Sequence, residues 1–565
     1  MKRIFLMLAI AVLSASCAQA PRTSSLAGTP TPSATVDVKI IAFNDFHGNL
    51  RTPSLRVAVP DASQSTGMRF EPAGGIEQFS AMVQSLKAQN KNVAVVSAGD
   101  MVGATPLLSA LFKDEPTIEA MNLVGIDFHA VGNHEFDYGV KHLKRLQGGG
   151  CKVDEKSGQP DCDGRPPYGG AKFEFLAANV IDNATGQPLF PAYAVKDFEG
   201  IKIGFIGLTT RTTPAIVRPG GTVGLTFKEE VETINALVPT LQAQGIEAIV
   251  VVMHEGGEQT GSINQCVDFK GRAREIAEKL DSAIQLIITA HTHRYYICEL
   301  GNKLITEAGS YGTLVTDIDL VLDRSTRKVI AKKARNIVVD PKGAKDAALT
   351  ALVDRYAGLS EPLENRVVGK LVREVNAVVG PSGESTLGNL IADAHLFGTA
   401  APDKGGAVIA FNNPGSLRAP IIPDTDGSVR YGELFKAQPF QNDLIIMTLT
   451  GKQLKNLLEQ QFASGDRTRL LGVSKGFSYT WDNAKPRGEK IVPGSIKLNG
   501  APVDPGLQYR VTANSFLAGG SEGMGLFREG TDRQVGMLDL EALGAMISAG
   551  SPVTPPSVGR ITRLN

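Results

Sequence analysis

The stretch VDVKIIAFNDFH, residues 36–47, joins an apolar run to residues of the kinds that bind metals. Val36–Phe43 is rich in Val and Ile, which is typical of a buried strand in an α/β sheet. Asp45 and His47 follow two positions apart, and in an extended segment such residues point to the same side. The stretch therefore predicts a strand whose carboxyl end offers two ligands to one ion.

Four further apolar runs end in the same way. They are Val93–Ser97 before Gly99-Asp100, Phe128–Val131 before Gly132-Asn133-His134-Glu135, Ile249–Val252 before Met253-His254, and Leu286–Thr289 before His291-Thr292-His293. Sites in α/β sheets form at the carboxyl ends of strands. We therefore expect all five endings to gather at the rim of one sheet.

The ligand types in these endings predict a centre of two metal ions. Seven nitrogen and oxygen ligands are more than one tetrahedral ion needs, and Asp100, alone after its strand, can bridge two ions. Such a pair clamps the attacking and leaving oxygens of an in-line displacement. Mixed ligation leaves Zn, Mn, Fe and Co open as the metal. The candidate ligands are Asp45, His47, Asp100, Asn133, His254, His291 and His293.

A candidate catalytic pair lies beside one ligand. His134 follows Asn133 directly, and Asp137 is three residues on, hence on the same face if a helix begins there. A His oriented by a carboxylate can stay protonated and face developing phosphate charge. A single Asp-x-His or His-x-His is more often structural, so the ordered series carries the prediction.

The bulk composition limits the partners. Lys+Arg and Asp+Glu are equal at 58 each, so no overall field attracts a nucleic acid polymer or an anionic membrane. With 565 residues, the chain is long enough for two or more domains. Any affinity for phosphate must come from a local site.

The amino terminus predicts export. Lys2 and Arg3 precede the short apolar run Ile4–Leu13, as in a signal peptide spanning 1–20. Cys17 follows small residues as in a bacterial lipoprotein signal, and cleavage after Ala18 or Ala20 is the alternative. We expect a periplasmic protein whose membrane contact, if any, is a lipid on Cys17 that anchors it to the outer membrane. Residues 21–35 read as a disordered tether.

The four other cysteines suit an oxidising compartment. Cys151 and Cys162 bracket a polar loop, so a bond between them would close a short ring. Cys266 and Cys298 each follow a candidate ligand segment, and a bond between them would brace the site. Four buried free thiols are the alternative.

The alternation of strand-like and helical stretches predicts the domain organisation. We expect a metal-binding α/β domain at 36–340, a linker helix within 341–365 and a second domain at 366–565. The predicted helices are Gly75–Asn90, Glu229–Gln244, Gly271–Leu280, Ala344–Leu363, Thr386–Gly398 and Gly451–Ser464, the last with Thr450 as N-cap. Strands are expected at Leu314–Leu322, Lys328–Val339, Ala407–Phe411, Leu444–Leu449 and Tyr509–Thr512.

The ordered motifs resemble those of the calcineurin-like metallophosphatases, and Gly132–Asp137 (GNHEFD) is similar to the 5′-nucleotidase and UDP-sugar hydrolase branch. The resemblance implies a four-layered α/β/β/α domain, a linker helix and a second α/β nucleotide-binding domain that swings to deliver substrate. It also implies a metal-bridging hydroxide as the nucleophile. By the resemblance, Asp45, His47, Asp100 and His293 hold one ion, Asp100, Asn133, His254 and His291 hold the other, and His134 with Asp137 forms the catalytic dyad.

The same resemblance assigns a substrate pocket to the second domain. Asn413, Gly415 and Arg418 stand in the loop expected to bind phosphate, with Arg418 as a forked donor. Phe440 and Phe516 match two rings that sandwich a base, where stacking contributes roughly 1–3 kcal/mol. In the absence of the resemblance, such aromatic residues would be assigned to the core.

Two positions depart from the family pattern. Pro381 stands where the family has a second phosphate-binding Arg, and Arg373 is our candidate replacement. Glu522 stands where the family has an Asp on the ribose. The sequence thus predicts a 5′-nucleotidase acting on nucleoside monophosphates. UDP-sugar or 2′,3′-cyclic-nucleotide hydrolysis and a non-catalytic nucleotide-binding lipoprotein remain as alternatives.

Overall fold

The computed structural model describes residues 34–565 except 54, 65–66, 154–159, 163–166, 218–219 and 464–469. The predicted signal peptide, Cys17 and the tether up to residue 33 lie outside the described residues. Thr35–Asn565 forms a single unit. Among its described helices, none is both long and apolar enough to cross a membrane.

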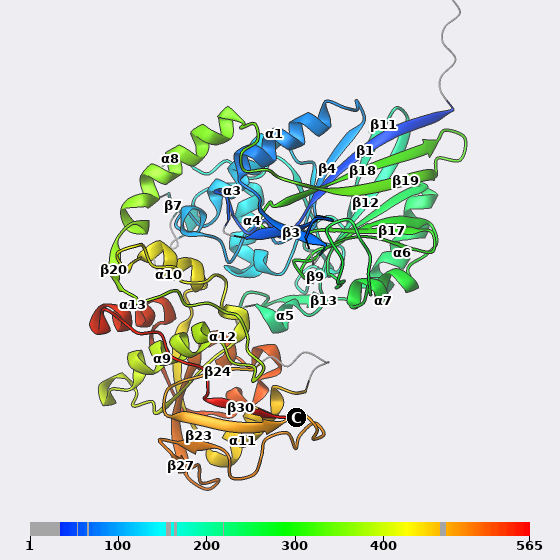
Figure 1. Cartoon of the computed structure of the whole chain (residues 1–565). Coiled ribbons are helices and arrows are strands. Elements are labelled where there is room, and N and C mark those ends of the chain that lie inside the picture. The colour runs from blue at the N-terminus through cyan, green and yellow to red at the C-terminus, as the bar shows by residue number, and fades with distance from the viewer. Residues whose placement is uncertain are drawn as a thin grey trace, which may run out of the picture. The chain divides into compact units, whose positions relative to one another are not determined.

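Two six-stranded sheets build the amino-terminal lobe (Figure 1). The first has the order β19-β18-β1-β4-β5-β8, with bounds Val329–Val338, Leu314–Asp323, Thr35–Phe43, Val93–Ser97, Phe128–Ala130 and Glu174–Leu176. The second has the order β11-β12-β14-β15-β17-β16, with bounds Tyr193–Phe198, Ile201–Thr209, Ala248–His254, Ile284–Ile288, Lys303–Ala308 and Tyr295–Leu300. The central strands β1, β4 and β5, like β14 and β15, run parallel.

The side chains of β1 show how the two sheets are packed. Val38 and Ile40 lie in an apolar cluster with Phe205 and Val250 of the second sheet. Because alternate residues of a strand face opposite sides, Ile41 instead joins the cluster beneath the flanking helices. A third cluster packs α6 and α7 on the far face of the second sheet. The resulting α/β/β/α layering confirms the predicted fold class.

The helices of this lobe lie outside the two sheets. They are α1 (Ile76–Lys87), α2 (Leu107–Ala110), α3 (Glu115–Val124), α4 (Gly139–Gly148), α5 (Thr213–Ile216), α6 (Glu230–Ala243), α7 (Arg272–Lys279) and α8 (Ala347–Glu364). The lobe also contains small sheets, namely β2-β3 (Arg56–Pro60, Met68–Pro72), β6-β7 (Lys152–Val153, Pro160–Asp161) and β10-β9-β13 (Gln187–Pro188, Val180–Asp182, Leu225–Phe227). Helix α8 is the predicted linker helix, and Leu349 and Tyr356 pack it onto the first lobe.

The carboxyl-terminal lobe is a second α/β structure. Its five-stranded sheet has the order β24-β21-β28-β23-β29, with bounds Gly472–Val473, Ile409–Asn412, Gln508–Asn514, Asp443–Thr450 and Thr531–Leu538. A smaller sheet, β27-β26-β25-β30, spans Ala501–Pro502, Lys497–Leu498, Phe477–Asp482 and Ile561–Leu564, and β20 (Val367–Lys370) pairs with β22 (Ser428–Arg430). The helices are α9 (Thr386–Thr399), α10 (Tyr431–Ala437), α11 (Gly451–Gln460), α12 (Ser515–Ala518) and α13 (Asp539–Gly550).

Two expectations about position need correction. The five ligand-bearing strands belong to two sheets, because β1, β4 and β5 lie in the first and β14 and β15 in the second. The helix expected over Gly451–Ser464 ends at Gln460, although Thr450 does cap it through a capping box with Gln453. The other helices and strands predicted from the sequence are confirmed to within a few residues.

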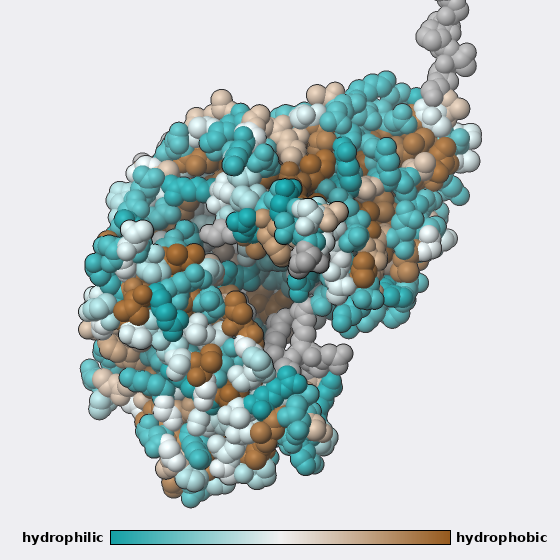
Figure 2. Space-filling view, in the orientation of Figure 1, coloured by the Kyte–Doolittle hydropathy of each residue, from teal (hydrophilic) through white to brown (hydrophobic). Residues whose placement is uncertain are grey.

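The predicted disulfides are both formed in the structure. Cys151 pairs with Cys162 and Cys266 with Cys298, with Cα–Cα distances of 4.8 and 5.1 Å. Cys298 lies buried on β16, so its bond ties the loop after β14 to the second sheet. On the face drawn in Figure 2, apolar residues lie singly or in small groups among polar ones, as on ordinary protein surfaces.

We predict that the double variant Cys266→Ser/Cys298→Ser loses about 2–4 kcal/mol of unfolding free energy, because the bond closes a loop of 32 residues. Urea unfolding under non-reducing conditions measures the change. The matched variant Cys151→Ser/Cys162→Ser opens a ring of only 11 residues and should lose less. An unchanged urea midpoint in the first variant would show that this bond does not stabilise the fold.

Candidate active site

The first group of ligand atoms lies where the two sheets meet. Asp45 and His47 follow β1, and His293 comes from the turn after β15. His47 Nε2 lies 3.2 Å from His293 Nε2 and 3.9 Å from Asp45 Oδ1. The same Asp45 oxygen is 3.3 Å from His293 Nε2. Three potential ligand atoms thus surround one point, although they come from residues almost 250 positions apart in the chain.

A second group of ligand atoms adjoins the first. It contains Asp100 after β4, His254 at the end of β14 and His291 after β15. His254 Nε2 lies 3.1 Å from Asp100 Oδ2 and also 3.1 Å from the side-chain oxygen of Asn133. The structure therefore brings together all seven residues that the sequence singles out as candidate ligands.

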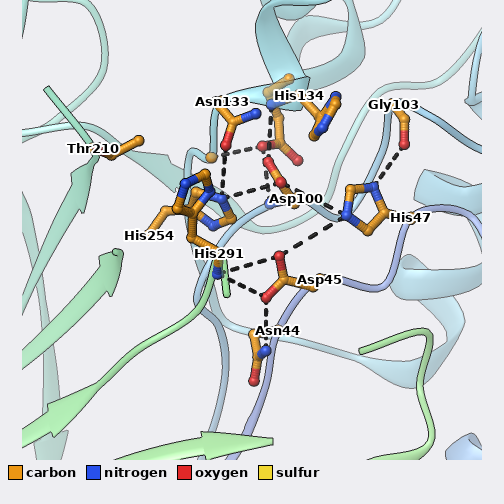
Figure 3. Close-up of polar contacts among 12 residues, drawn as sticks. Asn44, Asp45, His47, Asp100, Gly103, Asn133, His134, Thr210, His254 and His291 are labelled. Carbon is orange, nitrogen blue, oxygen red and sulfur yellow. Dashed lines mark hydrogen bonds and ion pairs between the residues drawn. The ribbon is translucent and has the colours of Figure 1, made fainter. Parts of the chain in front are cut away.

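Asp100 lies between the two groups (Figure 3). Its Oδ2 atom is 3.1 Å from His254 in one group and 3.7 Å from His47 in the other. Its Oδ1 atom accepts a hydrogen bond of 2.9 Å from the backbone N–H of His134. One carboxylate oxygen is thus fixed by the backbone while the other faces both groups.

The hydrogen bonds of two imidazoles suit metal ligation. His47 Nδ1 donates to the carbonyl of Gly103 over 2.8 Å, and His254 Nδ1 donates to the carbonyl of Ala98 over 2.9 Å. A proton held on Nδ1 leaves the lone pair on Nε2, which is the atom that faces the other ligands. This donor set fits two divalent cations, one at each group.

The backbone of the ligand residues is strained. Asp45, His47 and Asp100 have φ between 45° and 50°, and His291 and His293 have φ of 73° and 55°. Residues other than glycine rarely adopt this left-handed region, and Asp and His tolerate it better than most. Such strain costs on the order of 1–3 kcal/mol per residue and persists only where the surroundings enforce it.

Two side chains that the sequence does not single out enforce this geometry. Glu135 accepts hydrogen bonds from the backbone N–H groups of Gly132, Asp100 and Met101 over 2.6–3.1 Å. Asn44 donates to Asp45 Oδ2 over 2.7 Å (Figure 3). Both residues stand inside the quoted motifs, but their positioning role depends on contacts between separate loops, which the sequence does not reveal.

Burial and neighbouring charges set the protonation of the site. Burial lowers the pKa of His47 well below its usual value, and burial together with the charge of His254 lowers the pKa of His291 to about 3. Burial raises the pKa of Asp100, but the neighbouring imidazoles outweigh it and lower that pKa overall. Neutral His47 and His291 beside ionised carboxylates are the forms that bind cations. His254 differs, because burial lowers its pKa but the neighbouring Asp100 outweighs burial and raises that pKa to about 10, so a cation there would displace a proton.

His134 and Asp137 form a pair beside these groups. A 3-10 helix, η1 (His134–Phe136), places the two side chains on one face, and His134 Nδ1 lies 2.8 Å from Asp137 Oδ2. Burial lowers the pKa of His134, but the charges of Asp137 and Asp100 outweigh burial and raise it above its usual value. The imidazole is thereby biased towards its protonated form.

A cavity of about 700 Å³ opens next to the ligand groups. Asp100, Asn133, His134, Asp137, His291 and His293 line it from the first lobe. All six residues predicted for the substrate pocket line it from the second lobe, namely Asn413, Gly415, Arg418, Phe440, Phe516 and Glu522. The sequence did not single out Thr212, Ala215, Ile216 or Val217, which also line it. These four residues follow β12 and carry no motif.

The prediction that Arg373 replaces the second phosphate-binding Arg of the family is wrong. Arg373 donates to the carbonyl of Pro555 over 3.5 Å and does not line the cavity. Pro381 does not line it either, and its neighbour Ser382 accepts from the indole of Trp481. Among the described residues that line the cavity, Arg418 is the only Lys or Arg.

Fold and site together define a metallophosphatase domain followed by a second α/β lobe. Residues 38–295 match the family model of the calcineurin-like phosphoesterases, and residues 367–529 match that of the 5′-nucleotidase C-terminal domain. The chain belongs to the 5′-nucleotidase family of metallophosphatases.

Relatives and a solved structure extend the match over most of the chain. Endonuclease YhcR of Bacillus subtilis is 31% identical over 94% of this chain, which spans 41% of that protein. The cell wall protein Lmo0130 of Listeria monocytogenes is 29% identical over 90% of this chain, which spans 66% of it. The crystal structure of a 5′-nucleotidase precursor from Thermus thermophilus is 25% identical with a TM-score of 0.73, covering 94% of this chain and 99% of that one.

Proposed function

We propose that the chain is an exported, metal-dependent 5′-nucleotidase that hydrolyses nucleoside 5′-monophosphates to nucleoside and phosphate. One observation carries the proposal. The two ligand groups that meet at Asp100 open into a cavity whose other wall holds Arg418 and two phenylalanines. Such a cavity presents cation sites to a phosphate and aromatic rings to the group that it esterifies.

The metal sites are assigned by their ligand atoms. Asp45, His47, Asp100 and His293 would hold one divalent ion, and Asp100, Asn133, His254 and His291 would hold the other. Zn, Mn, Co and Fe all suit this mixed nitrogen and oxygen set. When bound, two such ions supply Lewis acidity, activate water at neutral pH and neutralise phosphoryl charge.

His134 and Arg418 are assigned to the charge that develops on the phosphoryl oxygens. The bond to Asp137 holds the His134 ring in one orientation, and the cavity wall places that ring next to the ligand groups. Arg418 Nε and Nη2 are buried and, among the residues that the structure describes, donate to no acceptor. Buried guanidinium donors without a protein partner suit an anionic ligand, because leaving them unpaired is costly.

Phe440 and Phe516 are assigned to the nucleobase, which would lie between their rings. In this structure Phe440 stacks on His134, with ring centroids 5.7 Å apart and an interplanar angle of 19°. Glu522, whose carboxylate accepts from Asn413 over 3.0 Å, is assigned to the ribose hydroxyls. Gly415 leaves room there, because a Cβ at this position would meet the Glu522 carboxylate.

Export is part of the proposal. The signal-like segment 1–20 supports it, as do two disulfides and a relative described as a cell wall protein. The same segment supports a periplasmic location. If Cys17 carries a lipid, that lipid would anchor the protein to the outer membrane. We also propose the division into a metallophosphatase domain at 36–340, a linker at 341–365 and a substrate-binding domain at 366–565.

A substrate panel tests the reaction. With added Mn, Co or Zn, we expect AMP and UMP to show the highest kcat/KM, and a chelator to abolish phosphate release. The panel includes UDP-glucose, a 2′,3′-cyclic nucleotide, a single-stranded DNA oligonucleotide and an aryl phosphate. Preference for UDP-glucose or a cyclic ester would establish the corresponding alternative. If the protein hydrolyses none of these substrates, the alternative of a non-catalytic nucleotide-binding protein would be favoured.

His134→Ala should lower kcat on AMP by about 100-fold or more, because a positioned donor to developing charge is lost. Metal content, measured by elemental analysis, should stay at the wild-type value, since His134 is assigned no ligand role. The neighbouring surface variant Lys141→Ala, on the same stretch of chain, serves as the control. Loss of metal from His134→Ala would reassign the residue as a ligand.

A further inference from the structure

Glu307 is a buried carboxylate close to the ligand groups, and no step of the proposed reaction uses it. It lies on β17, a strand that carries none of the proposed ligands, and its exposed fraction is 0%. Burial raises the pKa of Glu307 well above its usual value, which favours the neutral acid. A buried carboxyl group is still costly unless hydrogen bonds satisfy it, so its hydrogen-bond partners indicate what it does.

The closest contacts that the structure records for Glu307 come from the turn that carries two proposed ligands, and the hydroxyls of Thr289 and Tyr296 also contact it. The backbone N–H of Arg294 donates to its Oε1 over 2.8 Å. The Thr292 hydroxyl lies 2.9 and 3.1 Å from its two oxygens, and it also donates to the carbonyl of Gly257 over 2.7 Å. Thr292 stands between His291 and His293, and both His residues have the left-handed backbone described above. Glu307 thus binds this turn at its centre and on its carboxyl side.

The residues after Glu307 hold the opposite side of the first ligand group. The backbone N–H of Ala308 donates to Asn44 Oδ1 over 2.8 Å, and Asn44 Nδ2 donates to the carbonyl of Gly309 and to Asp45. The N–H of Tyr311 donates to the carbonyl of Asp45 over 2.7 Å. One short segment therefore contacts both Asp45, from the first sheet, and the turn that bears His293, from the second.

We propose that Glu307 is a positioning residue for the first ion: by binding Thr292 and Arg294, it fixes His293 at the distance from Asp45 and His47 at which one cation contacts all three. The proposal rests on the metal sites of the proposed function. It assigns Glu307 no contact with the ion or the substrate.

The exposure and the backbone conformation of His293 explain why its turn needs to be held in place. The His293 side chain is 27% exposed, whereas Asp45 and His47 are fully buried, so His293 is the least enclosed ligand of this group. Its backbone conformation is unfavourable unless it is enforced. Partners that orient ligands from outside the coordination sphere typically change metal affinity by 10–100-fold. Without Glu307, we expect His293 to leave the geometry that the ion requires.

The test measures metal binding in Glu307→Leu. This substitution removes both carboxyl oxygens and puts an apolar side chain of similar size in their place. Metal-free protein is titrated with Mn²⁺ or Zn²⁺, with ions counted by elemental analysis after equilibrium dialysis. We expect affinity for one of the two ions to fall by about 10–100-fold and the other to change little. Glu307→Gln, which keeps one acceptor, should recover part of the loss. Glu299→Leu, on the neighbouring strand β16 with an exposed side chain, is the matched control.

Melting temperatures separate positioning from a general structural role. A positioning role predicts that Glu307→Leu mainly reduces the stabilisation gained on adding metal, while its metal-free melting temperature stays near that of Glu299→Leu. Equal destabilisation with and without metal, or unchanged affinity for both ions, would overturn the proposal. If Glu307→Leu fails to fold, Thr292→Val removes the Glu307 contact together with the bond to the carbonyl of Gly257, and it should weaken the binding of one ion alone. Absence of bound ions in the wild-type chain would instead refute the metal sites themselves.

Discussion

The site depends on one arrangement of charge, in which two carboxylates are buried where two sheets meet. Asp45 and Asp100 are 0% and 1% exposed, and imidazoles from both sheets surround them. Removing a carboxylate from water costs several kcal/mol even after the protein relaxes, unless positive charge or donors compensate it. Asn44 and the N–H groups of His134 and His291 supply part of this compensation. Two bound cations would supply the rest, which links metal binding to the stability of this region.

This arrangement explains why the ligand loops tolerate strain. Five of the seven proposed ligands have positive φ, and side chains from other loops hold them in place. Glu135 binds the loop of Asp100, Asn44 binds Asp45, and Glu307 binds the turn of His291 and His293. Most of the ligands thus stand on loops, but a network anchored in the two sheets determines their geometry. Preorganised ligands of this kind bind metal without first paying for loop ordering.

Much of the site was predictable because its residues stand at the ends of strongly apolar runs. The ligand types that follow continuous Val- and Ile-rich runs identified each strand ending, and the offset of three residues identified the pair His134–Asp137. The extended backbone expected around Asp45 and His47 was wrong, because both residues have the left-handed conformation. The assignment of the strands to two sheets was not predictable, because a Val- and Ile-rich run does not specify which strands it pairs with. Glu307 was missed because its contacts join β17 to a turn more than ten residues away, with no motif around it. Arg373 was misplaced because a family pattern gives no distance to the cavity for a residue outside the matched motif.

Diffraction from crystals grown with Mn²⁺, collected at a wavelength where manganese scatters anomalously, tests the central claim most directly. The account predicts two anomalous peaks a few ångströms apart, one beside Asp45, His47 and His293 and the other beside His254, His291 and Asn133, with Asp100 contacting both. A single peak, or none at these residues in crystals of active protein, would contradict it.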